Sequence, residues 1–212
     1  MNELTYHVWA KLDQNGSGGL FNYNSGWNRG YRVVFANTAH NFNYGHNADY
    51  LADDNATFNY LEWYLLSGTF KEDDPTSGTN TAKVFINGVL NNSRLTAKNL
   101  GNNWSSSNPF ELFRADYNLS YSYPMEGSIG RCVIMDRAQS ESEILDFYNT
   151  GYVDPTDANL ICDWQLNEGT GTAINDSGDN SNDGTKGSGL EWVAESNYQR
   201  GTVVSTNLLA GI

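Results

Sequence analysis

The chain has 212 residues, of which 25 are acidic and 12 are basic, so its formal net charge is −13. Nucleic acids and anionic membrane surfaces carry charge of the same sign, which argues against either as a partner. With 13% aromatic residues, 21 glycines and only 4 prolines, the composition is typical of short strands joined by turns. A length of about 200 residues suits one all-β domain.

Alternation of apolar and polar residues predicts a series of strands. The predicted strands cover residues 6–12, 31–36, 63–70, 82–86, 110–114, 129–135 and 160–166. Asn87-Gly88, directly after the fourth, is a strong signal for a two-residue hairpin. In the first and last strands the apolar residues share one face, and these are Tyr6, Val8, Ala10 and Leu12, then Leu160, Cys162, Trp164 and Leu166.

One helix is predicted between Ser140 and Gly151. Ser140 and Glu143 form a capping box, and Gly151 supplies the left-handed residue that ends a helix. The predicted inward stripe consists of Ile144, Leu145 and Tyr148. A helix of about three turns is not stable alone, so we expect it to pack on the strands. Asp154-Pro155 then starts a linker.

Two longer motifs follow one another along the chain. The first, within residues 127–152, contains Asp136-Arg-Ala-Gln-Ser-Glu-Ser-Glu-Ile144. The second, within residues 160–184, contains Asn167-Glu-Gly-Thr-Gly171 and Asp176-Ser-Gly-Asp-Asn180. Both resemble motifs of the LamG-like, concanavalin A-type jelly-roll family, as do residues 6–12, 63–70 and 82–89. The resemblance implies an all-β, concanavalin A-like jelly-roll sandwich with one short helix.

The order of these motifs is reversed. In the family that they resemble, the Asn-Glu-Gly motif usually opens the domain and the Asp-Arg-Ala motif closes it. The chain is therefore either circularly permuted or cut out of register from a tandem array. We expect one domain over residues 1–212, with a main body at 1–152, a displaced first-strand motif at 159–193 and a C-terminal tail at 194–212.

No catalytic constellation is recognisable. Glucan-cutting enzymes of this fold carry Glu-x-Asp-x-x-Glu on one strand, where the two Glu act as nucleophile and acid, and that spacing does not occur in this chain. The nearest acidic cluster, Glu72-Asp73-Asp74, falls where we expect a solvated loop. The three histidines, His7, His40 and His46, show no metal-binding spacing. We expect no enzymatic activity.

No cofactor is required, and calcium is the only ion that the resemblance suggests. Many relatives hold Ca²⁺ at the sandwich edge with an acid after the closing-strand Ile, where this chain has Gly130-Arg131. Asp176 and Asp183 are the candidate ligands, although we favour a turn whose Asn and Asp side chains bind local backbone. Cys132 and Cys162 lie in the two motifs; a disulfide is conceivable, and we favour buried free thiols.

A sugar site needs an aromatic platform and planar polar groups. Two stretches of the chain are rich in both, and the candidate residues are Trp27, Asn28, Tyr31, His46, Asp49, Trp104 and Tyr121. For any one of these residues, packing within the sheet or its loops is the simpler interpretation. Host-surface glycans are the ligands that such a site would bind.

Met1 is followed by neither a basic region nor an apolar run, and no apolar stretch is long enough to span a bilayer. We therefore expect a virion surface protein made in the cytoplasm, a phage capsid decoration or fibre subunit that contacts capsid or tail proteins. The alternative is an extracellular glycan-binding module from a larger secreted protein. The uncharged tail at 201–212 is either a contact for a homo-oligomer or one more strand of the sandwich.

Overall fold

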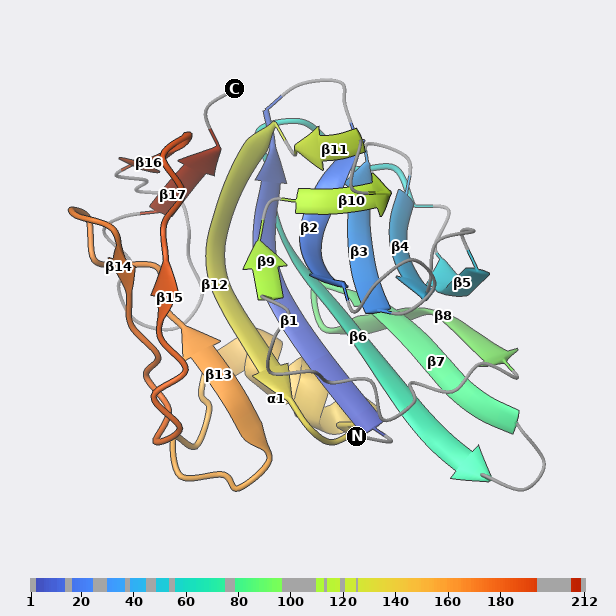
Figure 1. Cartoon of the computed structure of the whole chain (residues 1–212). Helices are drawn as coiled ribbons and strands as arrows, with labels where there is room; N and C mark the ends of the chain where they lie inside the picture. The colour runs from blue at the N-terminus through green and yellow to red at the C-terminus, as the bar shows by residue number, and fades with distance from the viewer. Residues whose placement is uncertain are drawn as a thin grey trace.

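The computed structural model describes residues 3–13, 17–24, 30–36, 39–44, 49–53, 56–74, 79–96, 110–112, 114–118, 121–124, 126–193 and 207–210. Within some strands the side chains are not described, and those strands are placed by their backbone. Two antiparallel sheets form a sandwich, with a short helix on the outer face of the larger sheet (Figure 1). The predicted all-β jelly roll with one helix is confirmed.

The large sheet has eight strands in the order β16-β17-β12-β1-β6-β7-β8, with β13 also paired to β12. Its strands are β1 (Glu3–Leu12), β6 (Trp63–Asp74), β7 (Thr79–Ile86), β8 (Val89–Thr96), β12 (Gly127–Met135), β13 (Leu160–Trp164), β16 (Leu190–Val193) and β17 (Asn207–Ala210). Every pair in it is antiparallel. Because β17 belongs to the tail and pairs with β12 and β16, the tail contributes a strand to the sandwich.

The small sheet has five strands in the order β5-β4-β3-β2-β9. They are β2 (Ser17–Asn24), β3 (Gly30–Ala36), β4 (Ala39–Tyr44), β5 (Asp49–Asp53) and β9 (Phe110–Leu112). The described residues also form two smaller two-stranded sheets, β10 (Arg114–Asn118) with β11 (Tyr121–Pro124) and β14 (Ala173–Ile174) with β15 (Gly184–Thr185). The first of these, a hairpin, lies across β2 (Figure 1).

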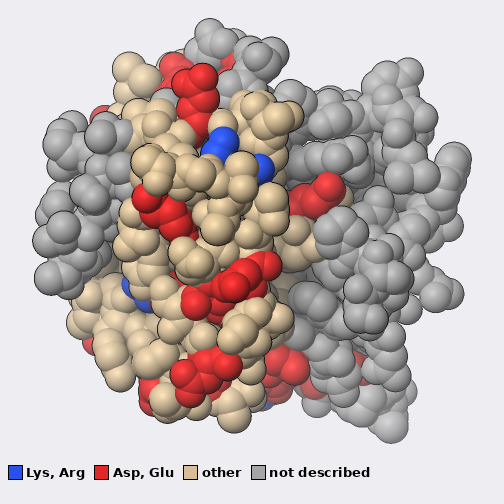
Figure 2. Space-filling model, turned by 60° about the vertical axis from the view of Figure 1, so that its left-hand side comes forward, with Lys and Arg blue, Asp and Glu red and all other residues tan. Residues whose placement is uncertain are grey.

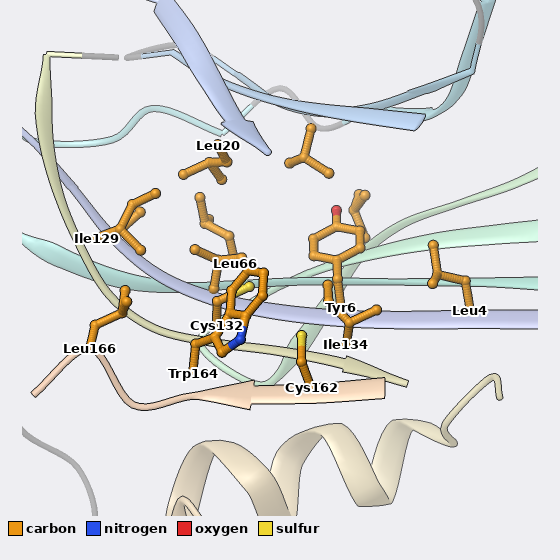
Figure 3. Close-up of a cluster of buried hydrophobic side chains, with 14 of the residues drawn as sticks. Leu4, Tyr6, Leu20, Leu66, Ile129, Cys132, Ile134, Cys162, Trp164 and Leu166 are labelled. Carbon is orange, nitrogen blue, oxygen red and sulfur yellow. The ribbon is translucent and has the colours of Figure 1, made fainter. Parts of the chain in front are cut away.

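The main core lies between the two sheets. Tyr6, Val8, Ala10 and Leu12 of β1 are all buried in it, as their alternation predicts. Leu20 and Val33 enter from the small sheet. Figure 3 shows Cys162 and Trp164 directed from β13 toward the same cluster as Tyr6 and Cys132, with the helix on the opposite side of the sheet. Burial of this many apolar side chains is the main force that holds the sheets together.

The helix α1 (Glu141–Thr150) packs on the outer face of the large sheet. Its predicted ends are confirmed: Ser140 and Glu143 form the capping box, and Gly151 has φ 66° and ψ 9°. The predicted inward stripe is partly wrong, because Leu145 is 43% exposed whereas Ile144 and Phe147 are buried. Phe147 is three residues beyond Ile144 and shares its face, whereas Leu145 is turned away by about 100°. No helix among the described residues has the length and apolar content needed to cross a bilayer.

The strand of the displaced motif lies beside the closing strand, as we expected if it takes the place of a first strand. β13 runs antiparallel to β12, with Cys162 opposite Ile134 and Trp164 opposite Cys132. The predicted shared face is wrong for Leu160. A register shift places Leu160 opposite Met135, so that it joins the second cluster beneath α1.

Both cysteines are buried free thiols. They are two positions out of register on the neighbouring strands β12 and β13. Burial raises the pKa of both thiols above the usual range, and for Cys162 the charge of Cys132 adds to this effect. The structure therefore matches the favoured interpretation of two small apolar core residues.

The hairpin at Asn87-Gly88 is confirmed, with φ 51° and 81° at its two central residues. The loop predicted at Glu72-Asp73-Asp74 is wrong, because β6 continues to Asp74 and still pairs with β7 there. Backbone pairing with the neighbouring strand outweighs the low strand preference of the acidic residues at this position.

Candidate functional site

The register of the small sheet gathers several strand ends at one edge of the sandwich. β2 ends at Asn24 opposite Gly30, where β3 begins. β4 ends at Tyr44 opposite Asp49, where β5 begins. β9 begins at Phe110, opposite Tyr23 near the end of β2. The connections 25–29 and 45–48 and the segment that leads into β9 therefore all start or finish at the same end of the sheet.

Two of the residues predicted to form the sugar site, Tyr31 and Asp49, lie at this end. The register places Tyr31 of β3 opposite Tyr44 of β4, and Tyr44 opposite Asp49 of β5. Their positions form one row across three strands, although they are far apart in the sequence. Tyr121 begins β11, opposite Asn118 of β10, in the hairpin that lies across β2. The other candidates lie outside the described residues, and they are Trp27, Asn28, His46 and Trp104.

A polar row that the sequence reasoning missed crosses the same sheet, one residue in from the row of Tyr31 and Tyr44. Asn22 of β2 stands between Glu111 of β9 and Arg32 of β3, and Arg32 stands opposite Asn43 of β4. Asn22 is only 5% exposed, and its Nδ2 atom has no hydrogen-bond partner among the described residues. A buried donor without a partner costs free energy, so this row can hold a water or a ligand hydroxyl. Alternating Asn residues in 22–24 and 41–43 are the signal that could have revealed it.

The two candidate calcium ligands serve local backbone. Asp176 accepts hydrogen bonds from the backbone N–H groups of Asp163 (2.8 Å), Gly178 (3.0 Å) and Asn182 (3.0 Å), using both carboxylate oxygens. Asp183 accepts one from the N–H of Asp176 at 2.9 Å. In the part of the chain that the structure describes, no group of three or more His, Cys, Asp or Glu side chains is placed to hold a metal. The geometry fits the turn that the sequence favours.

The same loop covers the free edge of β13. Asn182 donates from its side chain to the carbonyl of Ile161 at 2.7 Å, and the Asn180 side chain donates to the carbonyl of Leu160. The backbone N–H of Ser177 donates to the carbonyl of Asp163 at 2.9 Å. An open strand edge is a template for unwanted pairing, and these bonds occupy it. The Asp-x-Ser-Gly-Asn motif therefore ends the sheet at this strand.

A buried ion pair joins β12 to β13. Arg131 contacts Asp163 in a bidentate manner, with Nε to Oδ1 and Nη2 to Oδ2 both at 2.6 Å, and the two side chains are 12% and 6% exposed. Arg131 also donates to the carbonyl of Gly151 and lies 5.3 Å from the ring centroid of Phe147. The guanidinium thus ties the closing strand, β13 and the end of α1 together.

On the described face seen in Figure 2, acidic side chains outnumber basic ones. Figure 2 shows many Asp and Glu side chains on this face and few Lys or Arg, in keeping with the net charge of −13. Such a field repels other polyanions and favours ligands that are neutral or positively charged.

Solved structures with the same fold include several proteins whose descriptions concern sugars. A protein from Bacteroides ovatus assigned to carbohydrate binding has a TM-score of 0.65 at 15% identity, over 88% of this chain and 52% of that one. The CBM40 of the Ruminococcus gnavus IT-sialidase, bound to α2,3-sialyllactose, gives 0.56 at 16% identity, covering 70% and 84% of the two chains. Domain 4 of AbnA, a GH43 extracellular arabinanase from Geobacillus stearothermophilus in complex with arabinotriose, gives 0.52 at 18% identity, covering 70% and 67%.

These likenesses concern the fold, because every identity is low. The chain spans about half of the Bacteroides ovatus protein, 52% of its length. A search of curated proteins finds no match. The family model of the concanavalin A-like lectin/glucanases superfamily, Laminin_G_3, matches residues 1–145, which include the main strands of both sheets and the start of α1. The chain therefore belongs to the concanavalin A-like lectin/glucanase superfamily.

Proposed function

We propose that this chain is a carbohydrate-binding module without catalytic activity. The observation that carries the proposal is the register of the small sheet, which gathers segments rich in aromatic and amide residues at one end of the sandwich. A sugar site needs these residue types close together, and the strand ends that flank these segments lie at the same end of the sheet. The low-identity likeness to the sialyllactose and arabinotriose complexes supports the same class of ligand.

The setting in which the module works is a separate proposal. We propose a virion surface, where a phage capsid decoration or fibre subunit made in the cytoplasm would attach to capsid or tail proteins. With a net charge of −13, attachment would depend on apolar and hydrogen-bonded contacts more than on ion pairs.

The rival setting is an extracellular module within a longer secreted protein. The coverage of only 52% of the Bacteroides ovatus protein favours this rival. The genomic context separates the two settings. Neighbouring capsid or tail genes would support the virion setting, and a longer reading frame with an export signal would support the secreted protein.

We also propose that the domain is circularly permuted. The pairing of β13 with β12 supports this proposal, since a first strand would occupy the same position beside the closing strand. The family model ends at residue 145, before the second motif begins.

A truncated chain of residues 1–152 would lose β13, and with it Asp163 and the loop that covers the edge. We expect this fragment to aggregate. A soluble fragment with cooperative unfolding would favour the cut tandem array.

The experiment for the proposed function combines binding with turnover. The purified chain is run in native gels that contain laminarin, arabinan, xylan or galactan, with bovine serum albumin as the non-binding control. We expect at least one polysaccharide to retard the chain. Release of reducing ends from the same polysaccharides is measured in parallel, and we expect none. Migration equal to albumin in every gel contradicts the binding proposal, and turnover contradicts the absence of catalysis.

A further inference from the structure

The connection from β5 to β6 lies at the opposite end of the small sheet from the candidate site. β5 leaves that site at Asp49 and ends at Asp53, near the start of β4. The described part of the connection begins at Ala56 and leads into β6 at Trp63. Its tip carries two apolar side chains in water, with Tyr60 38% exposed and Leu61 67% exposed. Neither side chain contributes to the clusters that form the core.

Hydrogen bonds hold this tip in one conformation. The N–H of Leu61 donates to the carbonyl of Leu12 at 2.7 Å, which fixes the tip to the end of β1. The N–H of Asn59 donates to the hydroxyl oxygen of Tyr64 at 3.0 Å, and Tyr64 packs edge-on against the buried Phe58 with ring centroids 4.9 Å apart. Leu61 adopts φ 63°, a left-handed conformation that a bulky residue rarely takes. Residues with a strained backbone cluster at active sites, ligand clamps and switch regions.

A carboxylate, that of Glu62, follows the two exposed side chains in the chain. Glu62 accepts hydrogen bonds from Asn59 Nδ2 at 3.0 Å and from the Tyr64 hydroxyl at 2.9 Å, and both reach the same oxygen, Oε2. These bonds, with that from Asn59 the larger effect, lower the pKa of Glu62, so the group is ionised at neutral pH. The ionised carboxylate of Glu62 and the side-chain amide of Asn59 therefore lie on the same short segment as the exposed Tyr60.

This combination has a defined chemical preference. A sugar ring offers an apolar C–H face and several hydroxyl donors, which match the Tyr60 ring and the acceptors on Glu62 and Asn59. A carboxylate repels sugars that carry their own carboxylate, and the overall charge of −13 adds to this repulsion. A sugar site on this tip would therefore select neutral sugars over sialic and uronic acids.

We propose that the tip formed by residues 59–62 is a second sugar-binding site, which stacks a neutral sugar residue on Tyr60 and accepts its hydroxyl hydrogen at Glu62. This inference rests on the proposed carbohydrate-binding function and adds a site that is separate from the strand ends of the small sheet. Sites at opposite ends of the sandwich can engage two stretches of one polysaccharide, so that weak contacts add through avidity.

The test uses single substitutions at exposed positions of the full chain. Tyr60→Ala removes the ring, and Glu62→Ala removes the acceptor. Tyr152→Ala and Glu191→Ala are matched controls, since Tyr152 is 68% exposed beyond the end of α1 and Glu191 is exposed on β16. Each variant is titrated with neutral oligosaccharides of glucose, arabinose, galactose and mannose, and with sialyllactose. Melting curves check that each variant is folded.

We expect the wild-type chain and both controls to bind a neutral oligosaccharide more tightly than sialyllactose. Tyr60→Ala and Glu62→Ala should each weaken that binding by about tenfold, the loss typical of a contact residue truncated in a binding site. Wild-type affinity in both folded variants would overturn the second site and leave the module's function standing. Failure of the wild-type chain to bind any sugar of the panel would overturn the site and the proposed function together.

Discussion

Tyr6 stands directly opposite Gly68 on the neighbouring strand, and its ring fills the space that a side chain at Gly68 would need. A Cβ atom there would lie 2.4 Å from Tyr6 Cε1 and 2.5 Å from Tyr6 Oη. Tyr6 is fully buried in the main core, so the ring has little freedom to move away. A glycine in the middle of a strand is otherwise unfavourable, and this contact explains why β6 contains one.

We predict that Gly68→Ala destabilises the fold by about 1–3 kcal/mol, because an added methyl overpacks the core. Urea denaturation measures the change. Gly187→Ala is the control, because a Cβ at Gly187 would meet nothing within 4 Å. Equal stability of Gly68→Ala and the wild-type chain would show that the ring of Tyr6 moves easily.

The ion pair between Arg131 and Asp163 gives a second prediction. Asp163→Ala leaves a guanidinium buried without its carboxylate, and breaking a buried pair in this way costs about 3–5 kcal/mol. The double variant Arg131→Met with Asp163→Leu should lose less than the single variant, since no charge stays buried. Glu141→Ala is the control, because the Glu141–Lys83 pair is more exposed (54% and 30%) and worth at most about 1 kcal/mol. A double variant less stable than Asp163→Ala would contradict this account.

His7 predicts a loss of stability in mild acid. Its ring lies 4.1 Å from that of Phe147 and makes hydrogen bonds with Ser67 (2.8 Å) and Gln139 (2.6 Å). Burial lowers the pKa of His7 from 6.5 to about 3; the bond to Gln139 opposes this shift, and the charges of Arg131 and Arg137 add to it. The unfolded chain therefore binds a proton that the folded chain excludes. The contribution of neutral His7 to the free energy of unfolding is therefore complete above pH 6.5, and it decreases progressively as the pH falls toward 3.

From this shift we expect a stability loss of about 2 kcal/mol between about pH 7 and pH 5, assigned to His7 alone. Urea denaturation of the wild-type chain and of His7→Gln at both pH values measures the part of the stability loss that is due to His7. The glutamine variant should lose less stability over this interval, because it has no group that titrates there. A pH dependence that is identical in the two proteins would show that the pKa of His7 does not change on folding.

The two candidate calcium ligands, Asp176 and Asp183, predict that chelators leave the stability of the chain unchanged. Both carboxylates already accept backbone hydrogen bonds, so they stabilise the loop without an ion. We expect EDTA to leave the melting temperature unchanged, since only a ligand bound to the native state raises it. A lower melting temperature in EDTA that is restored by added Ca²⁺ would reveal a calcium site. Asp176→Asn should destabilise the chain in either buffer.

Local signals in the sequence predicted part of this fold well. The alternation in residues 6–12, the capping box at Ser140 and the Asn87-Gly88 turn each depend on neighbours in the chain, and the structure confirms all three. The face of Leu160 was not predictable, because it depends on a register shift against Met135 of another strand. Strand β4 was missed because its asparagine and histidine residues have a low preference for strands, and its pairing with β3 and β5 supplies the stability.

The candidate site was less predictable than the fold. The residue types at Tyr31 and Asp49 suggested sugar binding, but their shared row is a property of the register of three strands. Asn22 alone gave no signal, since an isolated asparagine is common in turns, and the only signal was the alternation of asparagines in 22–24 and 41–43. Its significance comes from its burial and its unpaired amide. The exposed tip at Tyr60 and Leu61 likewise reads as an ordinary apolar run until its exposure is known.

The most direct test of the central claim is a glycan microarray probed with the wild-type chain. The array should carry neutral arabinan, glucan, galactan and mannan fragments beside sialylated glycans at matched density. Carbohydrate binding predicts reproducible, saturable signals on at least one class of glycan, and the acidic surface together with the Glu62 tip predicts that this class is neutral. Signals no higher than those of albumin on every glycan would contradict the assignment of this chain as a carbohydrate-binding module.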